Sequence, residues 1–152
     1  IKIFLNSGLR VSEALNLKVN DIDWETGRLF VRAGKGNRDR ILFLKEDDME
    51  LYRRWLKARP TDSEYLFCAL NGARMGDRNV RYIIKGYARQ ANIKKDVHPH
   101  ALRHSFATDM LKNTKNIRLV QKALGHTSIA TTMIYTHISD EELELALKGF
   151  RV

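Results

Sequence analysis

The chain has 152 residues, which is enough for one domain with a sizeable hydrophobic core. Its 27 lysines and arginines against 18 acidic residues give a formal net charge of +9, which favours polyanionic partners; ribosomal and membrane-surface proteins share this property. The single cysteine, Cys68, cannot form an internal disulfide, and no apolar run approaches the roughly 18 residues of a membrane span. No signal peptide is visible, and nothing in the sequence suggests secretion.

The first third of the chain predicts short helices followed by a β-hairpin. Residues 1–18 have the pattern of a helix, a turn at Asn6-Ser7-Gly8 and a second helix. Residues 28–31 and 40–44 are typical of two strands, and the glycine-containing segment 33–39 between them is typical of a hairpin loop.

The middle of the chain predicts a further strand between two helices. A helix is expected from about Glu46 to Ala58, stopped by Pro60, and Tyr65-Leu66-Phe67 could add a short third strand. Residues 78–91 predict an amphipathic helix. Its apolar face is expected to carry Val80, Ile84, Tyr87 and Ala91.

The last third predicts four helices in succession. Pro99 suits a first helical turn, Gly125 suits a C-terminal cap, and Ser139 with Glu142 forms a capping-box pattern. The expected helices run from 99 to about 112, from 117 to 124, from 127 or 128 to about 135, and from 139 onward. The chain is therefore predicted to be α+β, mainly α-helical with a small antiparallel β-sheet of about three strands.

Several scattered residues are of the types that bind and cleave a phosphodiester. His100 and Arg103 fall in the first turns of a helix, whose N-terminus attracts phosphate, and a guanidinium can hold two phosphate oxygens. Arg10 follows Gly8 at another helix start. A metal-free phosphoryl transfer requires arginines, a lysine, histidines and a tyrosine. The candidates of these types are Arg10, Lys35, His100, Arg103, His126 and Tyr135.

Taken singly, each of these residues has a plainer interpretation. Arg10 with Glu13 is a capping pattern, Lys35 is a solvated hairpin lysine, and Tyr135 is a half-buried tyrosine. His100 and His104 at positions i and i+4 could instead bind zinc, but the acidic residue that usually accompanies such a pair is absent. We therefore expect no metal and no cofactor.

A basic surface is the second feature that bears on partners. The helix at 78–91 places basic side chains along one face, followed by Lys94 and Lys95. One arginine lies in the hairpin loop and another directly follows it. The plainer interpretation is a solvated face; the alternative is a surface that follows the phosphates of DNA without reading its sequence. The candidate DNA contacts are Arg38, Arg40, Arg78, Arg81, Lys85 and Arg89.

The motifs together resemble those of the tyrosine recombinases, the phage-integrase family, in their catalytic domain. The resemblance covers nearly the whole chain in the family's order. It rests on Gly8-Leu9-Arg10-Val11-Ser12-Glu13-Ala14, His100-Ala101-Leu102-Arg103-His104, Leu124-Gly125-His126 and Tyr135. It implies site-specific DNA recombination or integration, in which strands are cut and rejoined through a 3′-phosphotyrosyl intermediate without metal or ATP.

The resemblance also implies a role for each matching residue. Tyr135 would attack the scissile phosphate, with His100 as its general base and Lys35 as the general acid on the leaving 5′-oxygen. Arg10 and Arg103 would stabilise the phosphate oxygens, helped by a hydrogen bond from His126. Glu13 would orient the arginine rather than touch the substrate.

The family further implies a domain organisation and partners. Residues 1–152 would be the catalytic domain, with an upstream core-binding domain missing, and the intact protein would act on double-stranded DNA as a homotetramer that can exchange its C-terminal helix. A cytoplasmic, nucleoid-associated location in a prokaryote or virus, with no membrane, is expected. Two alternatives stay open: a type IB topoisomerase, which shares the tyrosine chemistry, and a DNA-binding module without catalysis.

Overall fold

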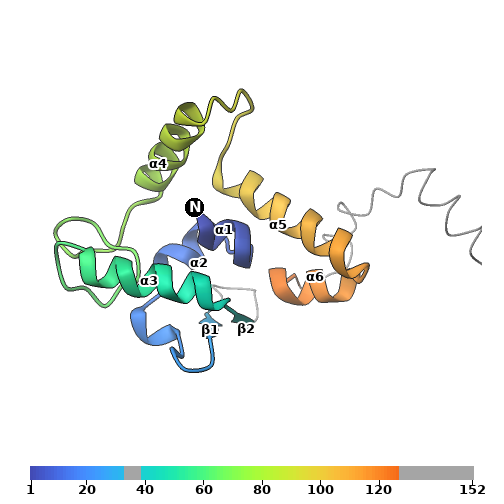
Figure 1. Cartoon of the computed structure of the whole chain (residues 1–152), viewed down its shortest axis with the longest axis horizontal. Coiled ribbons are helices and arrows are strands. Elements are labelled where there is room, and N and C mark those ends of the chain that lie inside the picture. The colour runs from blue at the N-terminus through green and yellow to red at the C-terminus, as the bar shows by residue number, and fades with distance from the viewer. Residues whose placement is uncertain (33–38, 127–152) are drawn as a thin grey trace, which may run out of the picture.

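The computed structural model describes residues 1–32 and 39–126 (Figure 1). Within them the chain is mostly helical with a small antiparallel sheet, as the sequence predicted. The elements are α1 (Lys2–Ser7), α2 (Val11–Asn16), the 3-10 helix η1 (Val19–Asp21), β1 (Arg28–Val31), β2 (Arg40–Phe43), α3 (Glu46–Ala58), α4 (Asp77–Gln90), α5 (Pro99–Thr114) and α6 (Ile117–Leu124). The two helices expected after residue 126 lie outside the described residues.

The sheet consists of β1 and β2, paired antiparallel with Arg28 opposite Phe43 and Val31 opposite Arg40. Successive side chains point to opposite faces, so Leu29, Val31 and Leu42 are buried whereas the outer face of the hairpin is exposed. The same alternation places Arg40 on the buried face.

The expected third strand at Tyr65-Leu66-Phe67 is not formed. Tyr65 makes only an isolated bridge with Lys18, held by backbone bonds from Val19 to Glu64 and from Leu66 to Leu17. The prediction was wrong because the segment forms a single bridge with the irregular chain after α2 and does not pair with β1 or β2. Its apolar side chains are used in the core, where Leu66 is fully buried.

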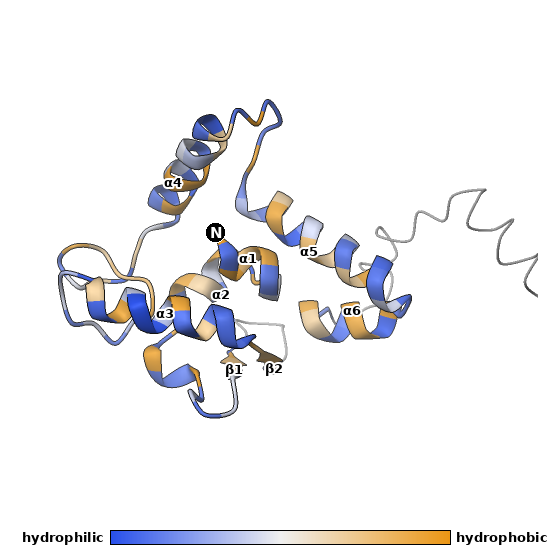
Figure 2. Ribbon diagram, viewed as in Figure 1, coloured by the Kyte–Doolittle hydropathy of each residue, from blue (hydrophilic) through white to orange (hydrophobic). Residues whose placement is uncertain are grey.

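The core gathers around α1 and α2, which lie at the centre of the view in Figure 1 with α3 on one side and α5 and α6 on the other. Figure 2 shows apolar stripes on the helices that alternate with polar ones. Gly8, at the end of α1, has φ of 61°, and a Cβ there would lie 2.2 Å from the Phe106 ring. Glycine therefore permits both the left-handed turn and the close contact between α1 and α5.

Helix α4 buries Val80, Ile84 and Ala88, at a strict spacing of four residues. Tyr87 and Ala91, which were predicted to share this face, are exposed. The observed buried face is therefore rotated only slightly from the predicted one, since a stripe at i, i+4 and i+8 turns slowly around the helix. No helix in the described part of the chain is long and apolar enough to cross a membrane.

Helices α5 and α6 carry clear start and stop signals. His98 caps α5 through its ring nitrogen Nδ1, which accepts from the backbone N–H of Ala101. Asn116 caps α6 by accepting from two backbone N–H groups, and Gly125 ends it with φ of 67°. This C-terminal turn of α6 packs against β2.

Candidate active site

The buried carboxylate of Glu13 is the centre of a set of charged side chains. Its oxygen Oε2 accepts the backbone N–H of Arg10 at 2.8 Å, and Oε1 accepts from Arg10 Nη1 at 3.1 Å. Arg40 donates from Nη1 and Nη2 to the two oxygens at 2.9 and 3.0 Å. Burial opposes ionisation of Glu13, but hydrogen bonds from Arg40 and Arg10 outweigh it and hold its pKa below the ordinary value.

Arg103 connects the Glu13 carboxylate to the chain turns at Gly8 and Gly125, which end α1 and α6. Its guanidinium donates to the carbonyl oxygens of Gly8 and Leu124, the latter at 2.8 Å, and Nη1 lies 3.8 Å from Glu13 Oε2. The side chain is buried, and Nη2 is 3.1 Å from His126 Nε2. One arginine on α5 therefore fixes the ends of α1 and α6 relative to each other.

His126 is held as a neutral imidazole. A guanidinium can only donate hydrogen bonds, so Nε2 of His126 must accept from Arg103 and the ring proton must be on Nδ1. Burial, followed by the positive charges of Arg103, Arg10 and Arg40, lowers the pKa of His126 to about 4. In the folded chain at neutral pH the ring is therefore uncharged.

We call Arg10, Glu13, Arg40, Arg103 and His126 the Glu13 cluster. Three guanidinium groups surround one carboxylate, so the set has a net positive charge, as an anion-binding site requires. The side chain of Arg10 is 34% exposed, against 6% for Arg40 and 5% for Arg103. Arg10 is therefore the arginine of the cluster that reaches solvent most.

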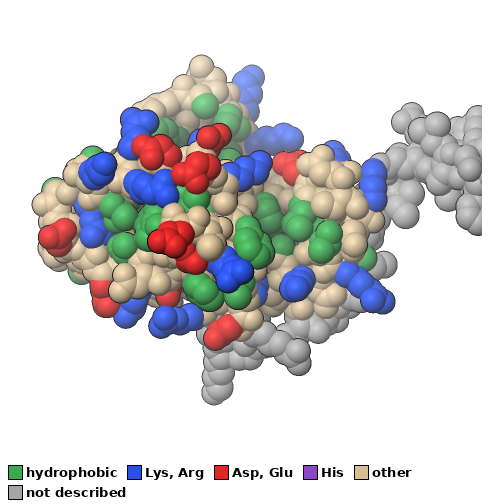
Figure 3. All heavy atoms as spheres, turned by 60° about the horizontal axis from the view of Figure 1, so that its bottom comes forward, with side chains coloured by type: hydrophobic (Ala, Val, Ile, Leu, Met, Phe, Trp, Pro, Cys, Tyr) green, Lys and Arg blue, Asp and Glu red, His purple; other side chains and the backbone are tan. Residues whose placement is uncertain are grey.

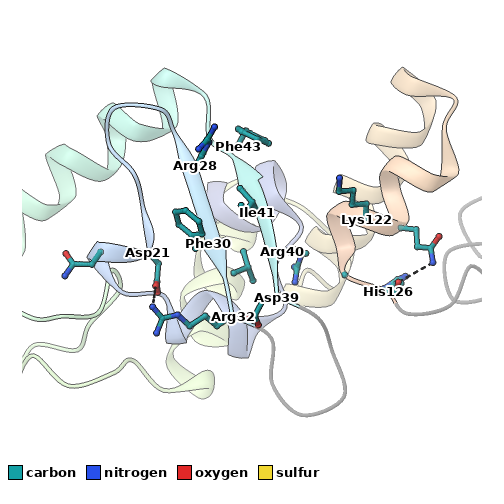
Figure 4. A pocket seen from close by; sticks show the side chains of 14 residues that line it. Asp21, Arg28, Phe30, Arg32, Asp39, Arg40, Ile41, Phe43, Lys122 and His126 are labelled. Atoms are coloured by element: carbon teal, nitrogen blue, oxygen red, sulfur yellow. Dashed lines mark hydrogen bonds and ion pairs between the residues drawn. The ribbon is translucent and has the colours of Figure 1, made fainter.

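A hollow of about 1220 Å³ opens beside the cluster, between the β-hairpin and the end of α6 (Figure 4). Arg40 and His126 lie along it together with Lys122, and the exposed rings of Phe30 and Phe43 line the part over the sheet. Two members of the cluster, Arg40 and His126, thus line an open hollow rather than a closed cavity.

The structure brings four predicted site residues together, namely Arg10, Glu13, Arg103 and His126. Of the other predicted site residues, Lys35, Arg38 and Tyr135 lie outside the described residues.

Arg40 requires a correction. It was expected on a DNA-contacting surface, but its side chain is buried and donates to Glu13 and to the Ala123 carbonyl. Strand alternation could have identified this, because Arg40 falls on the same face as Leu42 and Leu44.

His100 occupies the first turn of α5 and is exposed. Its ring stacks parallel to that of His98 with centroids 6.3 Å apart. Among residues 1–32 and 39–126, no group of three or more His, Cys, Asp or Glu side chains is placed to hold a metal ion. The zinc interpretation of His100 and His104 therefore gains no third ligand within these ranges.

The basic side chains of α4 lie at the surface. Four of them are exposed: Arg78, Arg81, Lys85 and Arg89. Among the ion pairs of the described residues, Lys85 is the one of these four that takes part, with Nζ 3.9 Å from Asp96. The basic face of α4 suits a polyanion. On the face toward the sheet, Figure 3 shows lysine and arginine side chains interspersed with acidic and apolar ones.

Comparison with known proteins identifies the relatives of this fold. Residues 1–142 match the model of the phage integrase family. The chain is 42% identical to tyrosine recombinase XerA of Pyrococcus furiosus over 97% of its own length and 52% of that protein. Its structure matches the crystal structure of XerA recombinase with a TM-score of 0.83 at 37% identity, covering 99% of this chain and 56% of the other.

A second solved structure shows a relative with its substrate. XerH site-specific recombinase bound to difH in a pre-cleavage complex matches with a TM-score of 0.82 at 32% identity, over 99% of this chain and 45% of that chain. The chain spans about half the length of the curated relatives it matches. Since the family model covers almost all of the sequence, the chain belongs to the phage integrase family.

Proposed function

We propose that this chain is the catalytic domain of a longer site-specific DNA recombinase that cleaves and rejoins DNA through a covalent bond to Tyr135. The observation that carries the proposal is the Glu13 cluster, in which Arg10 and Arg103 converge on one carboxylate with a net positive charge, next to His126, which lines the open hollow. The 42% identity to a tyrosine recombinase over nearly the whole chain supports the same reaction.

In the proposed reaction the cluster holds the scissile phosphate. Arg10 and Arg103 stabilise the negative charge that develops on the non-bridging oxygens, and removing one such group typically slows a reaction by about 10² to 10³. His126 carries its proton on Nδ1 and can donate it in a hydrogen bond to the phosphate. A bound phosphate adds negative charge and would raise the pKa of His126 from its low value.

The chemical step is assigned by similarity to the family. The phenol oxygen of Tyr135 bonds to phosphorus, its proton passes to His100, and the bond to the 5′-oxygen breaks as Lys35 protonates the leaving group. The link retains the phosphodiester's energy, so attack by a 5′-hydroxyl of another strand rejoins the DNA with no ATP. We assign no metal or other cofactor to any of these steps.

The proposed partners are duplex DNA and further copies of the recombinase. The exposed arginines and lysine of α4 would contact DNA phosphates, as would Arg38. XerH has been crystallised on its difH substrate, which supports DNA as the ligand of this fold. A homotetramer on DNA, with exchange of the last helix between subunits, and action on the nucleoid in the cytoplasm complete the proposal.

The test is covalent trapping on nicked duplexes that release the cleaved 5′ strand. The full-length recombinase, its Tyr135→Phe variant and a matched Tyr82→Phe variant on exposed α4 would be compared for protein–DNA bands resistant to SDS. A band lost only in Tyr135→Phe is expected. DNA binding without any band would instead indicate a binding module, and relaxation of supercoils without a partner site would indicate a topoisomerase.

A further inference from the structure

We propose that Arg40 is a positioning residue of the phosphate site: it holds the Glu13 carboxylate and the end of α6, and so keeps Arg10 and Arg103 available to an incoming phosphate. The inference rests on the proposed function of the Glu13 cluster. It concerns Arg40, which the sequence analysis named only as a candidate DNA contact and not as part of the phosphate site.

Arg40 makes the most complete contact with Glu13. Nη1 and Nη2 donate to the two carboxylate oxygens at 2.9 and 3.0 Å, and Nε donates to the Ala123 carbonyl at 2.7 Å. This two-pronged geometry is the strong form of an arginine–carboxylate pair. Because Nε, Nη1 and Nη2 of Arg40 all donate to protein acceptors, this guanidinium is placed to organise the protein rather than to grip DNA.

The charges explain why this matters for Arg10 and Arg103. Both lie near Glu13, with Nη1 atoms 3.1 and 3.8 Å from its oxygens. Without Arg40, the buried carboxylate would have only these two guanidinium groups as neutralising partners in the cluster. Because a buried charge strongly favours the partners that remain, Glu13 would compete with phosphate for them.

A second contact extends the role of Arg40 to the turn that carries His126. A Cβ on Gly125 would lie 2.9 Å from Arg40 Nη1, so the Leu124-Gly125-His126 turn rests directly on the guanidinium. Leu124 and His126 are also the α6 groups that contact Arg103. Arg40 therefore supports Arg103 from two sides, through Glu13 and through the end of α6.

The position of Arg40 in the chain links these contacts to the hairpin. It is the first residue of β2 and is paired with Val31 of β1. A lysine in its place would keep the charge but could not bond both carboxylate oxygens and a carbonyl at once. Geometry as well as charge is therefore required.

The experiment compares Arg40→Met, Glu13→Gln and the double variant in two assays. One assay follows the His126 ring signal by NMR while inorganic phosphate is added without DNA. The other measures single-turnover covalent trapping at saturating DNA with the full-length recombinase. Arg118→Met, an exposed arginine on α6 that does not line the hollow, is the matched control, and thermal melts verify folding.

Arg40→Met is expected to weaken phosphate binding at least ten-fold and to slow trapping about 10² to 10³, with DNA affinity changed less than about three-fold. Adding Glu13→Gln to Arg40→Met should restore both the phosphate affinity and the trapping rate by at least ten-fold. No such recovery is expected if Arg40 serves only to fill space in the core. Should Arg40→Met fail to fold, Arg40→Lys takes its place, with a loss of at least ten-fold expected in trapping.

Values like the wild type in a folded Arg40→Met, or no recovery in the double variant, would overturn the role of Arg40. A wild-type protein that neither binds phosphate nor forms a covalent product would instead overturn the proposed function. The two failures are therefore distinguishable.

Discussion

The Glu13 cluster and helix α4 use the same residue type in opposite ways. The cluster fixes Arg40 and Arg103 in the interior with named acceptors at each end, whereas the arginines of α4 stand on an exposed face. A buried, preorganised guanidinium can stabilise a transition state, while an exposed one contributes mainly salt-dependent affinity. Burial thus makes the same separation as the sequence motifs, between the arginines proposed for chemistry and those proposed for binding.

The largest expected effect comes from removing a buried arginine of the Glu13 cluster. Arg103→Met leaves the carbonyls of Gly8 and Leu124 without their donor and removes a cation near Glu13. We expect a loss of about 3–5 kcal/mol in the free energy of unfolding, measured by denaturant titration. Arg118→Met, on the exposed side of α6, should change it by less than about 0.5 kcal/mol, and equal effects would contradict the assignment.

The turn that carries His126 offers the next test. Gly125→Ala places a Cβ 2.9 Å from Arg40 Nη1 at a φ of 67°. We expect a destabilisation of about 1–3 kcal/mol in thermal unfolding, together with a shifted His126 ring signal. Gly86→Ala in α4 is the matched control, because nothing lies within 4 Å of its Cβ and alanine should stabilise the helix by about 0.5–1 kcal/mol.

A pH titration sharpens the description of the cluster. The pKa of His126 is about 4 in the folded chain and 6.5 in the unfolded one, so below pH 6.5 the unfolded state binds more protons. His126 therefore reduces stability progressively as pH falls from 6.5 through 4, and contributes no such loss above that window. Urea titrations from pH 7 to 4 on His126→Asn should show a shallower loss than the wild type.

Removing an exposed arginine of α4 should give the smallest effect. Arg81→Ala removes one cation from the face of α4 without disturbing the buried stripe of Val80 and Ile84. The logarithmic salt dependence of DNA affinity should become shallower by about 0.9 if Arg81 neutralises one phosphate. Fluorescence anisotropy over a salt series measures this slope, and an unchanged slope would remove Arg81 from the contact surface.

Local signals made most elements predictable from the sequence. Pro99 and Gly125 marked the bounds of α5 and α6, and Pro60 marked the stop after α3, because these residues act on their own backbone. The failed third strand at Tyr65 and the exposed Tyr87 depended on which surface lay opposite. Propensity and periodicity carry no information about that surface.

The site was only partly predictable for the same reason. Contacts of Arg103 with the Gly8 and Leu124 carbonyls join segments that are far apart in sequence, and no local pattern indicates them. The family resemblance implied only that Arg10, Arg103 and His126 act in one site. Arg40 was misplaced because a strand arginine beside a basic loop has the composition of a DNA contact. Its pairing with Glu13 arises from the sheet register and the approach of α6, which appear only in three dimensions.

The division of roles is tested most directly by one matched measurement, the single-turnover rate of covalent trapping at saturating DNA for Arg10→Lys and Arg81→Lys. Both variants keep the charge, but only a site that needs the planar fork of arginine should suffer from lysine. We predict that Arg10→Lys slows trapping at least ten-fold and that Arg81→Lys leaves it within two-fold. Equal rates in the two variants would contradict the proposal that the Glu13 cluster holds the reacting phosphate.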